Sequence, residues 1–418
     1  MWERHINPLN VIKSLSMALE LLSSHLSFHH WRVAMIAMEI AEEMKLSYED
    51  SALLLQAALL HDIGAAPSWN IRMKLRLKSQ TYKEKKIENR YIEHAYKGYE
   101  FLKGSDRFSN IAKIILHHHE SWRDSKNDKN IPIQSRILHL ADWVDLAIDS
   151  ERNVLLQAEC IRNDVKKMSG RLFMPELVTA FLAASGKESF WLNIVNKFYA
   201  ETFFEHNEYY RMTMPYTEED IIDIAGIYAN IIDEASGFTY NHSRSVSKIA
   251  VFLAEERGFS ENEIKDIMIA GLLHDIGKLS IPNSVLEKPS GLNDEEFALM
   301  RQHTYYTYRI LEQIDGFEQI AQWAAYHHEY LDGSGYPFHY TAENLPMGSR
   351  IMAVADIFVA LREDRPYRKG LSEDKILTIM REMVNNNKID KRLVKIISQN
   401  YKIVSFLVKG SGTGQDIR

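Results

Sequence analysis

An ordered pattern of histidines and aspartates occurs twice along the chain, and this repeat constrains the fold more than any other feature. In each half a histidine precedes a His-Asp pair by 32 residues, and the strings around the pairs match, QAALLHDIGA against IAGLLHDIGK. Another histidine, a His-His-Glu triplet and an aspartate follow in the same order. The sets are His29, His61, Asp62, His94, His118, His119 and Asp142, and His242, His274, Asp275, His303, His327, His328 and Asp356. Because chance is a poor explanation for such a series, we interpret the chain as a duplication.

The repeat sets the predicted domain organisation. The first domain spans about residues 1–205 and the second about 215–408, followed by a flexible tail at 409–418. Apolar residues recur at intervals of three and four, as in 221–232 and 264–273, and we find no convincing series of alternating strands. Gly64, Gly258 and Gly277 follow helical runs, as C-terminal glycines do. We therefore predict an all-α fold of two tandem, duplicated helical domains.

Composition excludes several classes of protein. The formal net charge of −7 argues against binding to polymeric nucleic acid. No apolar run reaches the roughly 18 residues of a membrane helix. The first residues, MWERHINPLN, lack the order of a signal peptide, so we expect a cytoplasmic protein without a membrane partner. The single cysteine, Cys160, rules out a disulfide framework, whereas 17 histidines favour a metal site of imidazole and carboxylate.

The second set of residues has the chemistry of a two-metal centre. Five imidazoles and two carboxylates suit Fe, Mn, Zn, Ni or Co better than Mg or Ca. Seven ligands are too many for one metal with an open position, but they suffice for two if Asp275 bridges them. The expected sites are His242, His274 and Asp356 for one metal, and His303, His327 and His328 for the other. Two metals about 3.5–4 Å apart can share a hydroxide and clamp an in-line phosphoryl displacement.

Motifs of the second domain resemble a known family. HDIGK at 274–278, HHEYLDGSGYP at 327–337, SRIMAVADIF and EDRPYR are similar to the HD superfamily of metal-dependent phosphohydrolases, and more narrowly to bacterial HD-GYP domains. The resemblance implies an all-helical domain that hydrolyses a 3′,3′-cyclic dinucleotide in second-messenger signalling. The substrate would be cyclic di-GMP or cyclic GMP-AMP, and the product a linear dinucleotide or mononucleotides. It also implies two divalent transition metals at the seven positions above, Fe or Mn first, with Ni, Co or Zn open.

The same resemblance assigns roles beyond metal binding. Lys278 matches a lysine that contacts the scissile phosphate, where an ammonium can neutralise charge in the transition state, so Lys278 and Asp275 are the predicted catalytic residues. The predicted substrate-binding residues are Lys278, Gly335, Tyr336, Pro337, Arg365 and Arg368. The alternatives are a solvated helix-end lysine for Lys278 and a loop-packing tyrosine for Tyr336.

Two positions depart from the family pattern. Some members hold a third metal through a glutamate four residues before the first histidine, where this chain has Phe238, so we expect two metals. Members often carry aspartate where this chain has Val359. We expect that change to affect packing or a hydrogen bond behind the metal ligands.

The first domain keeps all seven candidate ligands, a possible second metal site, but lacks the substrate residues. Ala65 stands at the position of Lys278, and SWRDSKND replaces the GYP loop. Three roles stay open: a structural or dimerising relic, a regulatory domain that binds metal or a nucleotide, and a second hydrolase with a different substrate. For the whole chain, the alternatives are a cyclic dinucleotide receptor with little turnover and an HD phosphohydrolase acting on other nucleotides. A homodimer is also left open.

Overall fold

The computed structural model describes residues 6–20, 28–67, 88–206, 216–236, 241–364 and 369–409. In these ranges the backbone forms helices joined by turns, and the only β-type pairings are isolated bridges such as that between Ile6 and Tyr216. The predicted all-α fold is therefore confirmed. The chain divides into two compact units, Asn7–Pro215 and the residues from Tyr216 onward together with Ile6.

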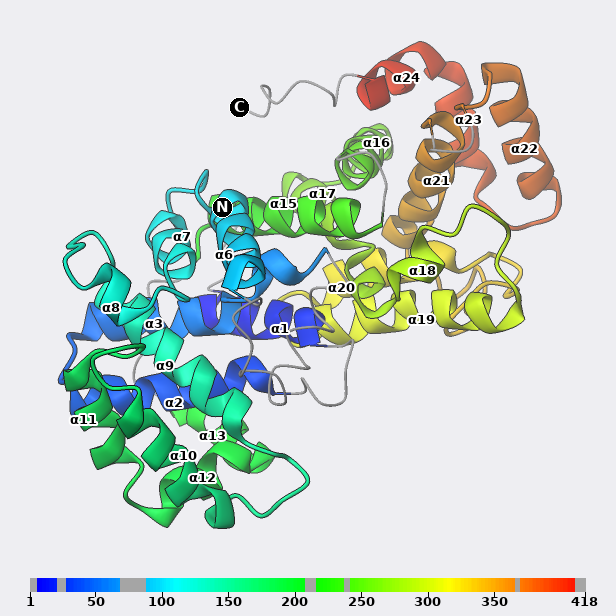
Figure 1. Ribbon diagram of the computed structural model, residues 1–418. Coiled ribbons are helices and arrows are strands. Elements are labelled where there is room, and N and C mark those ends of the chain that lie inside the picture. The colour runs from blue at the N-terminus through cyan, green and yellow to red at the C-terminus, as the bar shows by residue number, and fades with distance from the viewer. Residues whose placement is uncertain are drawn as a thin grey trace. The chain divides into compact units, whose positions relative to one another are not determined.

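The first unit is built around α2, which packs against α3, α9 and α11. Its elements are α1 (Pro8–Glu20), α2 (His29–Glu43), α3 (Tyr48–Leu60), η1 (Ile63–Ala65), α6 (Glu88–Leu102), α7 (Ser109–Leu116), α8 (Trp122–Ser125), α9 (Ile133–Ala147), α10 (Leu155–Lys167), α11 (Pro175–Ala184), α12 (Glu188–Val195) and α13 (Lys197–His206) (Figure 1). Here η1 is a single 3₁₀ turn, and it packs against α6.

The second unit repeats this arrangement around α16. Its elements are α15 (Glu218–Ala235), α16 (His242–Glu256), α17 (Glu261–Leu273), η3 (Ile276–Ser280), α18 (Asn283–Leu286), α19 (Asp294–Leu311), α20 (Glu318–Ala325), η4 (Tyr326–His328), α21 (Met347–Arg362), α22 (Glu373–Asn385), α23 (Lys391–Gln399) and α24 (Tyr401–Lys409). Helix α16 packs against α17 and α21 as α2 packs against α3 and α9, and the 3₁₀ turn η3 packs against α19 as η1 does against α6.

Local sequence explains where the helices around the site begin. The helices α15, α17 and α19 start at capping boxes, in which a side chain at the N-cap and an acidic residue three positions later satisfy each other's backbone N–H groups. The N-cap residues are Thr217, Ser260 and Asn293. These boxes satisfy backbone N–H groups at the helix starts locally, and the far end of α17 carries His274.

The glycines predicted to end helices have two different roles. Gly258, with φ of 75°, follows α16 as a C-terminal glycine does. Gly64 and Gly277 lie inside η1 and η3 instead, and a Cβ at Gly277 would collide with the backbone carbonyl of His303. Close packing of η3 on α19 therefore requires this glycine.

Two further findings concern the ends of the chain and the membrane. Helix α24 reaches Lys409, and the rest of the predicted tail, 410–418, lies outside the described residues. Within the ranges that the structure describes, no helix is long and apolar enough to cross a membrane.

Candidate metal centres

The seven predicted ligands of the second unit lie close together. They come from the start of α16, the junction of α17 with η3, the middle of α19, the turn η4 and the helix α21. Five of them are at most 2% exposed: His242, His274, Asp275, His303 and His327. Buried imidazoles and carboxylates at this density need partners, because unpaired polar groups are costly away from water.

The ligand atoms form two groups with Asp275 between them. The groups are His242, His274 and Asp356, and His303, His327 and His328, and within each the ligand atoms lie within 4.8 Å of one another. Oδ2 of Asp275 is 3.4 Å from Nε2 of His274. Its other oxygen, Oδ1, is 3.5 Å from Nε2 of His303 and 3.9 Å from that of His327. One carboxylate thus faces both groups, as expected of a bridge.

Three of the imidazoles are oriented by the backbone three residues before them. Nδ1 of His274 donates to the carbonyl of Gly271 at 2.8 Å, and Nδ1 of His327 donates to that of Ala324 at 2.7 Å. His303 makes the same bond to Met300 at 2.6 Å. Because a carbonyl only accepts, the proton sits on Nδ1 and the lone pair on Nε2 points into the cluster, as in metal-binding histidines.

Two buried atoms of the cluster fit a metal. Neither Nε2 of His274 nor Oδ1 of Asp275 has a hydrogen-bond partner among the described residues. Burial lowers the pKa of His303 to about 3 and that of His327 to about 4, so both rings are neutral at pH 7, which is the form that binds metals. The donor set of nitrogen and carboxylate oxygen suits divalent transition metals.

His242 is held by a carboxylate that the sequence analysis did not identify. Nδ1 of His242 lies 2.9 Å from Oε2 of Glu363, just after α21, and Nε2 lies 3.4 Å from Oδ1 of Asp356. Burial disfavours the charged ring, but the hydrogen bonds that the ring donates to Asp356 and Glu363 outweigh this effect and raise the pKa of His242 to about 10. A metal at Nε2 must therefore displace a proton.

Lys278 adds a positive charge beside the bridge position. The turn η3 places its Nζ 2.5 Å from Oδ2 of Asp275, and the side chain is 12% exposed. Despite its own burial, Asp275 has a pKa well below the usual value, because Lys278 and the surrounding histidines favour the carboxylate. Lys278 is thus a largely buried lysine that pairs with Asp275 at the cluster.

The GYP loop is fastened to the histidine doublet. The backbone N–H of Tyr336 donates to the carbonyl of His328 at 3.1 Å, and the two rings are 5.0 Å apart. A Cβ at Gly335 would collide with the same carbonyl, so glycine is required there. The carboxylate of Glu329 accepts backbone N–H bonds from residues 338, 339 and 340. Glu329 is the third residue of the His-His-Glu triplet, which could have pointed to this role.

Three positions from the sequence analysis cannot be placed. Arg365 and Arg368, the predicted phosphate or guanine contacts, lie outside the described residues, as does Phe238. Pro337 follows Tyr336 in the fastened loop.

The seven residues of the first set also come together. Nε2 of His94 is 3.2 Å from Oδ1 of Asp62 and 3.3 Å from Nε2 of His118. Nε2 of His119 is 3.1 Å from Nε2 of His94. Nε2 of His29 lies 3.7 Å from Asp62 and 3.5 Å from Asp142, and Nε2 of His61 lies 3.6 Å from Asp62. Both units therefore contain the same arrangement of imidazoles around a carboxylate.

The surroundings of the first cluster differ from those of the second. Nδ1 of His29 is 2.6 Å from Oδ2 of Asp145, which also binds Arg32. Ala65 has no charge to offer where Lys278 stands, and the short helix α8 follows the doublet where the second unit has the GYP loop. The first unit thus has the candidate ligands without the predicted substrate groups.

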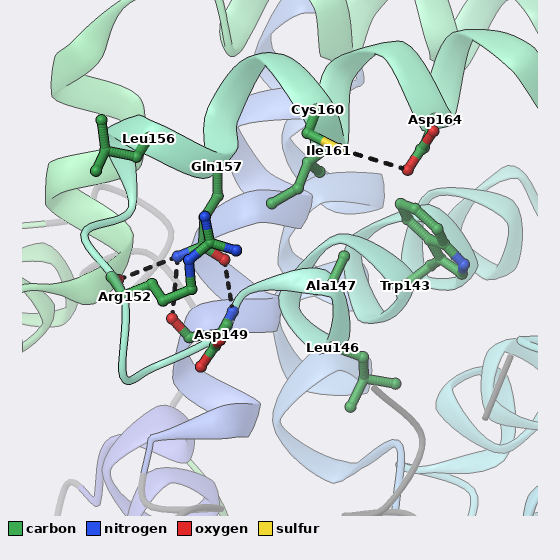
Figure 2. A pocket seen from close by; sticks show the side chains of 10 residues that line it. All are labelled: Trp143, Leu146, Ala147, Asp149, Arg152, Leu156, Gln157, Cys160, Ile161 and Asp164. Carbon is green, nitrogen blue, oxygen red and sulfur yellow. Dashed lines mark hydrogen bonds between the residues drawn. The ribbon is translucent and has the colours of Figure 1, made fainter. Parts of the chain in front are cut away.

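A pocket in the first unit lies outside both clusters (Figure 2). Its lining residues are Trp143, Leu146, Ala147, Asp149, Arg152, Leu156, Gln157, Cys160, Ile161 and Asp164. The side-chain amide of Gln157 donates hydrogen bonds to the backbone carbonyls of Asp149 and Arg152, each at 3.0 Å, and so holds the loop at the edge of the pocket. None of the predicted site residues lines this pocket, so it is not the predicted active site.

Comparison with known proteins identifies an HD domain in each of the two units. Residues 27–147 and residues 226–393 each match the HD domain family. The 3′3′-cGAMP-specific phosphodiesterase 1 of Vibrio cholerae serotype O1 is 31% identical over 394 residues, 89% of this chain and 86% of that protein. A cyclic di-GMP phosphodiesterase of Thermotoga maritima is 42% identical over 132 residues, 31% of this chain and 36% of the relative. A crystal structure of the V. cholerae cyclic GMP-AMP-specific phosphodiesterase V-cGAP3 shares the fold, with a TM-score of 0.63 and 24% identity, covering 96% of this chain and 98% of that one.

Proposed function

Because this chain belongs to the HD-domain cyclic dinucleotide phosphodiesterases, we propose that its second unit hydrolyses a 3′,3′-cyclic dinucleotide at a two-metal centre bridged by Asp275. The observation that carries the proposal is the position of Asp275. One of its oxygens faces His274 and Lys278, and the other faces His303 and His327. The first unit has a similar carboxylate in Asp62 but lacks the lysine.

The chain's own residues would bind and orient the substrate phosphate. Two divalent metals, when bound, supply a nucleophile from water and positive charge at the phosphate. Lys278 donates a further charge from a preorganised, largely buried position, where it acts more strongly than in water. The loop fastened by Glu329 holds Tyr336 over the doublet, at the edge where a nucleotide base would lie. Such positioning contributes several kcal/mol to lowering a barrier.

Cyclic GMP-AMP is the substrate that we propose to test first. The relative that matches 89% of this chain is a 3′3′-cGAMP-specific enzyme by name, whereas the T. maritima cyclic di-GMP enzyme matches 31% of it. The phosphodiester chemistry is the same for both dinucleotides, so only the base contacts would distinguish them.

The direct test is to incubate the purified full chain with Mn²⁺ or Fe²⁺ and with 3′3′-cGAMP, cyclic di-GMP or ppGpp in turn. We expect cleavage of the cyclic dinucleotides, faster for 3′3′-cGAMP, to linear products. Binding without turnover would instead support a receptor. Cleavage of ppGpp alone would support a different HD phosphohydrolase.

Glu363 offers a test of how His242 is oriented. In the first unit the carboxylate that contacts Nδ1 of the first histidine is Asp145, three residues after Asp142. The matching position in the second unit is Val359. There Glu363, seven residues after Asp356, supplies the carboxylate. Losing an outer partner of a ligating histidine typically costs about 10–100-fold in metal affinity. We expect that loss for Glu363→Ala, measured by competition between Mn²⁺ and a chelator.

A second variant separates orientation from general damage. Adding Val359→Asp to Glu363→Ala returns a carboxylate to the place that Asp145 has in the first unit, so it should restore part of the lost affinity. Unchanged affinity in Glu363→Ala would show that Glu363 does not orient His242. No recovery in the double variant would show that the two carboxylates are not interchangeable.

A further inference from the structure

Arg301 is an exposed arginine of α19 that lies beside the GYP loop of the second unit. It stands two residues before the candidate ligand His303. Its Cζ lies 5.4 Å from the centre of the Phe297 ring, one helical turn earlier, and Phe297 is 46% exposed. Because a cation is attracted to the face of an aromatic ring, Phe297 restricts the positions that the guanidinium takes.

Tyr336 connects this pair of residues to the metal cluster. The rings of Phe297 and Tyr336 are 6.2 Å apart in an edge-to-face arrangement, and the Tyr336 ring lies 5.0 Å from that of His328. Burial raises the pKa of the Tyr336 phenol, and the charge of Asp275 raises it further. The charge of Arg301 acts on the same phenol in the opposite direction. One side chain is therefore close to both the proposed bridge and Arg301.

A second arginine of α19 has the same kind of ring contact but also a carboxylate partner. Cζ of Arg309 lies 5.0 Å from the centre of the Tyr305 ring, and its Nη1 lies 2.6 Å from Oε1 of Glu312. Arg301 has no ion pair with a carboxylate among the described residues. Its planar fork of N–H donors is therefore available to an anion from outside the chain.

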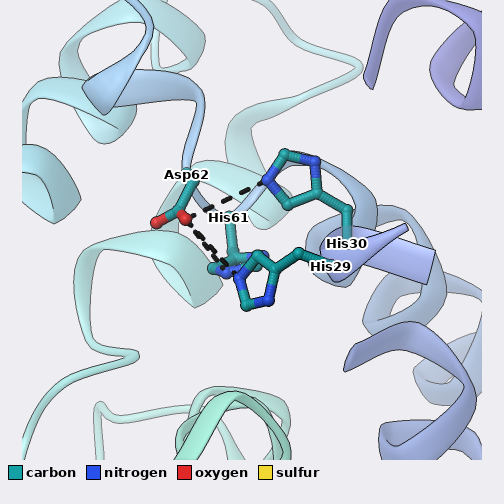
Figure 3. A group of neighbouring side chains, drawn as sticks. All are labelled: His29, His30, His61 and Asp62. Carbon is teal, nitrogen blue, oxygen red and sulfur yellow. Dashed lines mark ion pairs between the residues drawn. The ribbon is translucent and has the colours of Figure 1, made fainter. Parts of the chain in front are cut away.

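The first unit has a similar cluster of candidate ligands but not this pair of residues. Figure 3 shows part of that cluster, three imidazoles around one carboxylate: His29, His30, His61 and Asp62. Counting back from His94, Glu88 stands at the position of Phe297. Ile92 stands at that of Arg301. The ring and the cation thus occur in the unit that has Lys278 and the GYP loop, as expected of groups that bind the substrate.

We propose that Arg301, held by Phe297, binds the phosphate of the cyclic dinucleotide that is not being cleaved. A 3′,3′-cyclic dinucleotide carries two phosphodiester anions. The metals and Lys278 would neutralise one of them, so the other needs a cation at the edge of the centre. A guanidinium offers two parallel N–H bonds to a phosphate. Phe297 acts through Arg301 and is a positioning residue. The inference rests on the function proposed for the second unit, and it adds a contact to the substrate.

The experiment compares Arg301→Ala with the parent chain in the hydrolysis of 3′3′-cGAMP with Mn²⁺. We expect KM to rise about 5- to 20-fold, between the effect of an exposed ion pair and that of a charged hydrogen bond away from water, with a smaller change in kcat. Bis(p-nitrophenyl) phosphate carries a single phosphate, so its kcat/KM should fall by much less. Arg301→Lys keeps the charge without the fork and should recover part of the loss.

Matched variants separate this role from general damage to the helix. Arg309→Ala removes the other arginine of α19 that lies over a ring, and it should leave KM unchanged. Phe297→Ala should raise KM, and Phe297→Tyr, which keeps the ring, should not. Circular dichroism reports folding. The inference is overturned if folded Arg301→Ala keeps the parental KM, or if it loses kcat/KM equally for both substrates.

Failure of the proposed function would give a different result. If the parent chain binds 3′3′-cGAMP without cleaving it, equilibrium dialysis gives a Kd in place of KM. The same rise is then expected for Arg301→Ala, and an unchanged Kd would overturn the inference. A parent chain that neither binds nor cleaves a cyclic dinucleotide would overturn both.

Discussion

Replacing His274 and Asp275 together by alanine should abolish cyclic dinucleotide hydrolysis and leave the second unit without bound metal. Asp275 faces both ligand groups, so its loss removes a ligand from each metal. His274 belongs to one of these groups, and its Nε2 has no hydrogen-bond partner among the described residues. Metal analysis after dialysis and chromatographic separation of the nucleotides would measure both effects.

The fold should tolerate this double change, because both side chains serve the cluster and not the apolar core. Circular dichroism of the variant provides that control. Asp275→Ala alone is expected to deplete both metals, since a bridging carboxylate is shared. Retention of two full metal equivalents in the second unit would contradict the bridge.

Lys278→Ala should lower kcat by about 10²–10³, the scale seen when one preorganised donor to a developing charge is removed. The metal content should stay close to that of the parent, because an ammonium group has no lone pair with which to bind a metal. Its charge sits 2.5 Å from Asp275 and largely out of water, so no solvent molecule replaces it fully.

A surface lysine is the matched control for this prediction. Lys288 makes an ion pair with Glu296 away from the cluster, and Lys288→Ala should leave kcat unchanged. An unchanged kcat in Lys278→Ala would exclude a role in the transition state. Loss of metal in parallel with kcat would show that Lys278 acts only by holding Asp275.

The repeated spacing was sufficient to predict which ligands come together. Every residue of the two sets stands on or beside a helix, and a helix fixes the direction of its side chains from their position in the sequence. The structure brings these side chains together in the predicted groups, with His303 and His327 in one and His242 and His274 in the other. The all-α fold followed from the same period.

The groups behind the ligands could not be found in this way. Asp145 lies three residues after Asp142, whereas Glu363 lies seven after Asp356, so aligning the two halves does not pair them. A carboxylate at any of several sequence positions could reach Nδ1 of His242. Which one does so depends on how the chain leaves α21.

Gly277 is a residue whose role the local sequence predicts wrongly. The helical run before Gly277 predicts a C-terminal glycine, but the structure shows Gly277 inside η3, where it permits contact with the backbone of α19. This role depends on the packing of α19 against η3, which the local sequence does not show.

The most direct test of the proposed division of labour compares two double variants in one assay of 3′3′-cGAMP and cyclic di-GMP hydrolysis. One carries His274→Ala and Asp275→Ala, and the other carries the matching changes His61→Ala and Asp62→Ala. Both are first shown to be folded by circular dichroism. We expect no hydrolysis from the first and measurable hydrolysis from the second, because only the second unit combines the ligands with Lys278 and the GYP loop. Hydrolysis that survives in the first variant and is lost in the second would place the catalytic centre in the other unit.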